Sequence, residues 1–113
     1  MARHVLIVLS NAVAGRDDEF NDWYSNRHLR DVLSLEGFVA AQRFRLSDEQ
    51  LRPDEPPPQR YLAVYEIDAP DLAVPLRALL SGVADGTIPL SETLDVASLS
   101  ARAFTPITGR VTV

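Results

Sequence analysis

The chain contains no cysteine and no lysine, and these two absences remove several kinds of chemistry. Without cysteine there is no disulfide framework, no thiol nucleophile and no thiolate metal ligand. Without lysine no side-chain amine can form a Schiff base, and all 11 basic side chains are arginines. Apolar runs are also short, so none approaches the length of a membrane-spanning helix.

Positive charge is scarce, because the formal net charge is −5. A chain of this charge without a basic cluster is not suited to phosphate-rich partners, so we expect no nucleic-acid and no membrane partner. Two histidines without a nearby acidic cluster do not predict a metal site. No glycine-rich phosphate loop or nucleophile elbow is present, and we expect no cofactor. The apolar run Val5–Leu9 is too short for a signal peptide, so we expect a cytoplasmic protein.

The pattern of apolar residues predicts one α+β domain over residues 1–113. Strands are expected at 4–10, 38–46, 60–67 and 98–105, and helices at 17–36 and 70–80, with Gly82 ending the second and a further short helix at 89–96. This order is the ferredoxin-like βαββαβ arrangement, a four-stranded antiparallel sheet with two helices on one face. The first and third strands are then central. The proline-rich, acidic segment Ser47–Gln59 is expected to be an extended mobile loop.

The central strands are apolar on both faces, although helices can cover only one. Val5, Ile7 and Leu9 alternate with Leu6 and Val8, and the third strand shows the same pattern. A soluble monomer rarely exposes an apolar face of several hundred Å². The sequence therefore predicts a homodimer that pairs through the uncovered sheet face.

A polar stripe interrupts the apolar face of the first helix. Read at about 100° per residue, Asn21, Ser25 and His28 lie in line with Val32, where a packing helix would carry leucine or alanine. Buried polar groups need partners or water, because leaving one unpaired costs about 1–3 kcal/mol. The stripe therefore indicates a pocket lined by polar groups.

The residues expected to line this pocket divide into two candidates for catalysis and four for ligand binding. His28 is the candidate proton-transfer residue, because its ordinary pKa is near neutral, and Tyr24 lies one turn before it. Candidate ligand-binding residues are Asn21, Ser25, Tyr61 and Tyr65. The alternatives are a core histidine hydrogen-bonded to a carbonyl or to a tyrosine, and aromatic core packing by the tyrosines.

Three further side chains, those of Trp23, Arg43 and Arg45, are expected to have structural roles. Trp23 is expected to point away from the centre of the apolar face, toward a loop or a subunit contact. Arg43 and Arg45 share one face of an edge strand and are suited to an anionic ligand. A surface or interface ion pair is the simpler expectation for both.

The run FNDWYSNRHLRDVLSLEGFVAAQRFRL, followed after a variable loop by RYLAVYEID, resembles the dimeric α+β barrel superfamily, and within it the small bacterial proteins near the ethyl tert-butyl ether degradation (EthD) family. The resemblance implies a homodimer with a cleft between sheet and helices in each subunit. Relatives include cofactor-independent monooxygenases, lactone isomerases, polyketide cyclases and haem-degrading enzymes. His28 matches the histidine of the family's helix, whereas the asparagine–tryptophan–arginine set of the quinone-forming monooxygenases does not map onto this chain.

Two functions follow as hypotheses. The first is a cofactor-independent lyase, isomerase or cyclase acting on a small hydrophobic, aromatic or carbonyl-containing metabolite. In it His28 moves a proton while Tyr24, Asn21 or Tyr65 polarises a carbonyl. The second is a non-catalytic homodimer that uses the same pocket to hold a ligand or acts in a stress response. Binding and proton-transfer pockets use the same residue types, so both hypotheses stand at this point.

Overall fold

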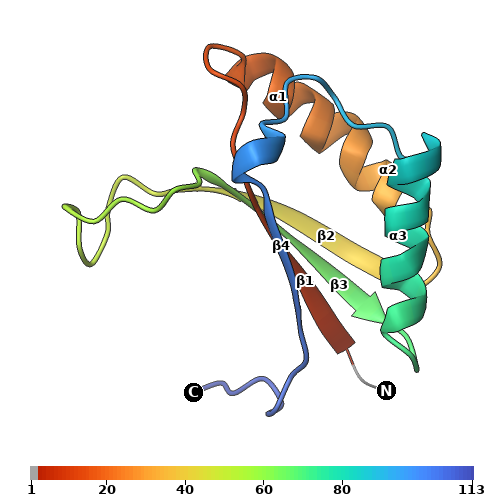
Figure 1. Ribbon diagram of the computed structural model, residues 1–113. Coiled ribbons are helices and arrows are strands. Elements are labelled where there is room, and N and C mark those ends of the chain that lie inside the picture. The colour runs from red at the N-terminus through yellow and green to blue at the C-terminus, as the bar shows by residue number, and fades with distance from the viewer. Residues whose placement is uncertain (1–2) are drawn as a thin grey trace.

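A computed structural model of the chain, described here over residues 3–113, contains one antiparallel sheet with helices on one of its faces (Figure 1). The strands are β1 (Arg3–Ser10), β2 (Phe38–Arg45), β3 (Tyr61–Asp68) and β4 (Ser100–Phe104), in the spatial order β2-β3-β1-β4. The helices are α1 (Asp17–Trp23), the π-helical turn η1 (Tyr24–His28), α2 (Leu29–Leu33), α3 (Ala73–Asp85) and the 3₁₀ turn η2 (Val96–Ser98). The predicted ferredoxin-like α+β fold, with its first and third strands central, is confirmed.

The two faces of the sheet differ in what covers them. On the helix-covered face, alternate residues such as Leu6, Val8 and Tyr65 are buried. We call the other side the open face; its apolar members are Val5, Ile7, Leu9, Ala40, Phe44, Leu62, Val64 and Phe104, and its polar members are Arg3, Gln42, Glu66, Asp68, Ser100 and Arg102. Phe44 and Phe104 are 44% and 56% exposed. The open face is thus an apolar surface of the sheet that no helix of the chain covers, as the alternation of the strand residues indicates.

Helix α3 does not end where the glycine pattern predicted. It continues through Gly82 to Asp85, and Gly86 follows in the left-handed conformation with φ +84°. Gly82 is needed for a different reason, since a Cβ there would lie 2.6 Å from Cγ1 of Ile88. Pro75 is buried within the first turn, where its missing N–H leaves no helical hydrogen bond unmade.

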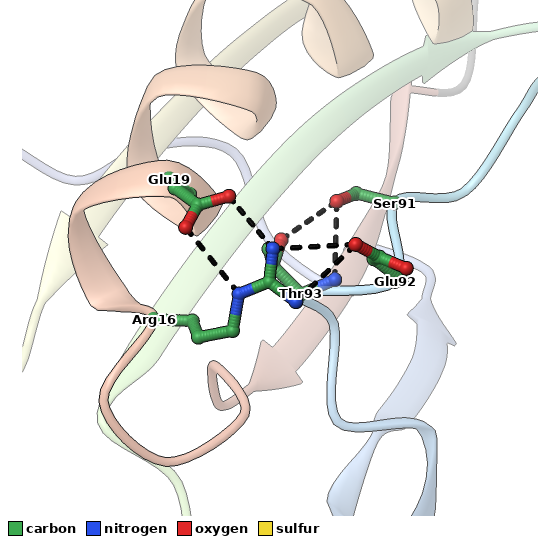
Figure 2. Close-up of polar contacts among 5 residues, drawn as sticks. All are labelled: Arg16, Glu19, Ser91, Glu92 and Thr93. Carbon is green, nitrogen blue, oxygen red and sulfur yellow. Dashed lines mark hydrogen bonds and ion pairs between the residues drawn. The ribbon is translucent and has the colours of Figure 1, made fainter.

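The short helix expected at 89–96 is absent from the described structure, because this segment pairs with the chain before α1. Leu94 forms a β-bridge with Ala12, and the Val13 N–H donates to the Thr93 carbonyl at 2.7 Å. Figure 2 shows the polar contacts beside this bridge: Arg16 donates to the carboxylates of Glu19 at 2.7 Å and Glu92 at 3.3 Å. The hydrogen bond from Arg16 lowers the pKa of the Glu19 carboxyl group. The connection between α3 and β4 is therefore fixed beside the first helix.

The first helix runs continuously through one π-helical turn. Its regular α-helical ends are α1 and α2, and the turn between them spans Tyr24–His28. In a π-turn the backbone bond reaches five residues along the chain, which brings side chains five apart nearer to the same side of the helix than in an α-helix. The run ends at Leu33, earlier than the predicted Glu36, and Gly37 takes φ +99°.

The connection between β2 and β3 projects away from the body of the molecule (Figure 1). Residues 47–58 are exposed throughout, and no helix or strand forms among them. The expected extended loop is therefore present, while its mobility stays a prediction. The extended backbone agrees with its content of four of the eight prolines.

Candidate functional site

A cavity of about 200 Å³ lies between the first helix, α3 and the helix-covered face of the sheet. We call it the His28 cavity; it is lined by Leu6, Val8, Tyr24, His28, Val32, Tyr65, Leu79, Leu80, Val83, Leu90, Leu94, Leu99 and Ala101. The connection before β4, which the Arg16 contacts fix, supplies part of its wall. Three polar side chains among so many aliphatic ones make it an apolar chamber with a small polar centre.

His28 lies at this polar centre without a hydrogen-bond partner. Its side chain is only 7% exposed, and its Nδ1 is buried and unpaired. The imidazole stacks on the Trp23 ring at a centroid distance of 4.7 Å and meets the Tyr24 ring edge-on at 4.8 Å. Trp23 and His28 are five residues apart, so the π-turn creates this stacking. A core histidine bonded to a main-chain carbonyl is therefore not what the structure contains.

The surroundings of His28 favour its neutral form. Burial lowers the pKa of His28 to about 4, the positive charge of Arg43 adds to that lowering, and the carboxylate of Asp31 opposes it. Asp31 Oδ2 is itself buried without a hydrogen bond, and it lies 3.5 Å from Nε of Arg27. At neutral pH the imidazole consequently carries no charge and can accept or donate one proton.

Tyr24 and Tyr65 form the second polar element of the cavity. The Tyr65 hydroxyl donates to the Tyr24 oxygen at 3.2 Å, and both groups are buried. Burial is the main cause that raises the pKa of each tyrosine, so both stay protonated. Because Tyr24 accepts this bond, its own hydroxyl proton remains available to a ligand in the cavity.

The other three predicted site residues lie elsewhere. Asn21, Ser25 and Tyr61 line a second depression of about 270 Å³ together with Phe44 and two arginines, Arg43 and Arg45. We call it the Arg43 pocket. Arg43 donates to Ser25 Oγ and to Asn21 Oδ1, both at 2.9 Å. The polar stripe of the helix is therefore divided between two places.

The structure places two further residues, Trp23 and Arg43, differently from what the sequence predicts. Trp23 does not point away from the helix centre, because the π-turn rotates it against His28. Arg43 makes no ion pair among the described residues, and its guanidinium instead lies 4.4 Å above the Tyr24 ring. Its alternation with Arg45 on an edge strand was the one signal in the sequence that indicated this placement.

Over residues 3–113 no group of three or more histidine or acidic side chains gathers at metal-binding distances. No described helix has the length and apolar character required to span a bilayer.

Solved structures of several proteins share this fold. An EthD family protein from Bacillus halodurans is 14% identical with a TM-score of 0.63, over 95% of this chain and 100% of that one. The haem degrader MhuD from Mycobacterium tuberculosis, with two haems bound in its active site, is 17% identical with a TM-score of 0.64, over 96% and 99%. A dimeric ferredoxin-like protein from an uncultured marine organism is 9% identical with a TM-score of 0.53, over 97% and 100%.

The comparison supports the fold that the sequence resemblance implied, an EthD-like ferredoxin fold, and at these identities it concerns the fold alone. No protein-family model matches the chain, and no curated protein matches it at a significant level. The function has to be argued from the site.

Proposed function

We propose that the chain is a cofactor-independent enzyme that moves a proton on a small hydrophobic, carbonyl-containing metabolite held in the His28 cavity. The observation that carries this proposal is the buried, neutral and unpaired imidazole, which lies edge-on against the Tyr24 ring at the polar centre of an apolar cavity. A polar group left unpaired in a core costs about 1–3 kcal/mol, and functional sites are the usual places where such a cost is kept.

The proposed reaction is an enolisation. His28 removes a proton from the carbon next to the carbonyl; the electron pair of that C–H bond forms a carbon–carbon double bond, and the π pair of the carbonyl moves onto its oxygen. The Tyr24 hydroxyl, whose proton is not used by Tyr65, stabilises the resulting enolate oxygen. Where the enolate is conjugated to a second double bond, return of the proton from His28 to the far carbon completes an isomerisation; where a leaving group stands on the β-carbon, its departure with that proton re-forms the carbonyl and completes an elimination. Neither outcome requires a further reactant.

The size of the cavity limits the substrate. About 200 Å³ is below the range of about 300–1,000 Å³ that is usual for drug-sized ligands. A single substituted ring or a short branched chain fits this volume, and a porphyrin does not. The haem chemistry of MhuD is therefore not part of the proposal.

Deuterium exchange tests the proposal without knowledge of the substrate. Small aryl ketones and β-keto esters are incubated with the protein in D₂O, and deuterium at the carbon next to the carbonyl is followed by NMR. We expect exchange catalysed by the protein to be lost in His28→Gln and reduced at least tenfold in Tyr24→Phe, because a positioned acid or base contributes about 10²–10⁴-fold. Tyr61→Phe is the matched control, because Tyr61 lies outside the cavity. Exchange that is equally fast in His28→Gln would contradict a catalytic role.

One observation favours a second function, the binding of a ligand without catalysis. A base with a pKa of about 4 is weak at neutral pH, since efficient proton transfer needs a value near the working pH. In the same NMR experiment a pure binder would show saturable shifts of Leu79 and Leu94 but no deuterium exchange.

We also propose that the working form is a homodimer paired through the open face. The apolar residues of this face are half-buried or exposed in the single chain, which is unusual for a soluble monomer. Light scattering at micromolar concentration should give twice the chain mass. Val64→Glu, in the middle of the face, should give a monomer of lower stability, whereas Val74→Glu on the exposed side of α3 should leave the dimer intact. A wild-type monomer would refute this proposal.

A further inference from the structure

The Arg43 pocket has a composition that the proposed enzyme does not use. Arg43 is half-buried, yet its hydrogen-bond partners are the neutral groups of Asn21 and Ser25. Arg45, on the same side of β2, makes neither a hydrogen bond nor an ion pair among the described residues. Two cations thus border one depression of about 270 Å³ without a counter-ion.

The acceptors around the pocket are already engaged. Asn21 Oδ1 accepts from Arg43, and the Tyr61 oxygen accepts from Asn21 Nδ2 at 3.3 Å. The Tyr61 hydroxyl donates to Asp17 Oδ2 at 2.6 Å, and the same oxygen lies 2.9 Å from Nη2 of Arg60. The carboxylate in this network is therefore held by two other donors.

The unused hydrogen-bonding capacity of the pocket is donor capacity. Nη1 of Arg43 donates to Ser25 Oγ at 2.9 Å and to the Asn21 carbonyl at 3.5 Å, and Nη2 donates once to Asn21 Oδ1, which leaves Nε–H and the second Nη2 hydrogen on one edge of the guanidinium. Ser25 accepts from Arg43, so its hydroxyl proton is free, and Arg45 retains all of its donors. A lining with free donors and positive charge fits an oxyanion.

The aromatic surroundings indicate which oxyanion. The Arg43 guanidinium lies 4.4 Å from the Tyr24 centroid, 5.5 Å from that of Phe20 and 5.6 Å from that of Tyr61, so a ring lies against its planar face. Its hydrogen-bonding edge remains for a planar partner. Tyr61 borders the same pocket.

We infer that the Arg43 pocket binds the carboxylate of a small aromatic or apolar acid. The carboxylate pairs with the free edge of Arg43 and with Arg45, and the apolar part of the ligand lies against Tyr61. Burial lowers the pKa of the Arg43 guanidinium, and a bound anion would oppose that effect. This inference does not depend on the enzyme proposed for the His28 cavity.

Benzoate, with benzamide as its uncharged analogue, is the probe that tests this inference. In ¹H–¹⁵N spectra of the labelled protein, benzoate should shift the signals of Ser25, Arg43 and Arg45 saturably, and added salt should weaken the effect. Benzamide should not produce these shifts. Arg45→Gln, which removes no side-chain hydrogen bond or ion pair among the described residues, should weaken benzoate binding roughly tenfold. Arg77→Gln removes one exposed charge from α3 and is the matched control.

Further results distinguish the Arg43 pocket from the His28 cavity and would overturn the carboxylate assignment. His28→Leu should leave benzoate binding unchanged, which separates this pocket from the His28 cavity. Saturable shifts that are equal in Arg45→Gln and wild type would overturn the assignment of the site, as would no saturable shift at all. Tighter binding of inorganic phosphate than of benzoate would overturn the assignment to a carboxylate.

Discussion

The polar side chains at the two ends of the helical stripe differ in their hydrogen bonding: those at one end are paired, and the one at the other end is not. At the first end, Asn21 and Ser25 are paired with Arg43, so their polarity connects the helix to the edge strand. At the other end, His28 lines a cavity and its Nδ1 has no partner. The same residue types therefore stabilise the fold at one place and cost stability at the other. Pairing, more than polarity, separates a structural polar group from a candidate functional one.

The largest expected effect is a difference in how pH acts on the stability of wild type and His28→Leu. The pKa of His28 in the fold is about 4, below the unfolded value of about 6.5. The unfolded chain therefore binds this proton first as pH falls, so stability is full above about pH 6.5 and declines toward pH 4, by up to about 3 kcal/mol. Denaturant unfolding at several pH values should show this decline in wild type in excess of that in His28→Leu. Parallel curves for both proteins would contradict it.

A smaller difference is expected between two substitutions of one helix to leucine. Asn21→Leu removes a paired group and should lower the free energy of unfolding by about 1–2 kcal/mol. His28→Leu removes an unpaired group, and at neutral pH it should leave stability unchanged or raise it. Urea unfolding of the two variants measures both values. A larger loss in His28→Leu than in Asn21→Leu would reverse the comparison.

The hydroxyl pair in the cavity should contribute less again. Tyr65→Phe removes the donor at 3.2 Å from Tyr24, and a single neutral hydrogen bond of this kind contributes about 1 kcal/mol. Thermal unfolding should register a loss of that order while the fold persists. A neutral effect would mean that the Tyr24 oxygen finds another donor in the cavity.

Cleavage within the loop 47–59 is expected to have the smallest effect on the His28 cavity and the Arg43 pocket. Limited proteolysis should cut first within this exposed segment, and the nicked protein should keep both pockets. Mass spectrometry of the early fragments locates the cuts. Protection equal to that of β2 and β3 would contradict the expected mobility.

The topology could be predicted from the sequence because it depends on local alternation and on turn residues. The run Val5–Leu9 and the third strand are the most uniformly apolar of the four strands, which agrees with their place at the centre of the sheet. The segment 89–96 was predicted wrongly, because the pairing of Leu94 with Ala12 joins residues far apart in the chain. Gly82 was interpreted as a helix end, whereas its role is to let Ile88 approach.

The candidate site was only partly predictable, for a geometric reason. A projection at 100° per residue assumes a regular α-helix and places Asn21, Ser25 and His28 on one line. The π-turn Tyr24–His28 breaks that line, and no residue type in the sequence marks it. The position of Arg43 under the helix depends on strand register, which a single sequence does not contain.

The central claim is that His28 is a neutral imidazole facing a cavity, and its side-chain ¹⁵N chemical shifts test this most directly. The protein has only two histidines, and His4, whose Nδ1 lies 2.9 Å from Thr105 Oγ1, provides an internal comparison. A pH titration should show His28 neutral down to about pH 5 and protonated only near pH 4, as its environment requires. Protonation of His28 at or above about pH 6.5, the ordinary value for histidine, would contradict the account.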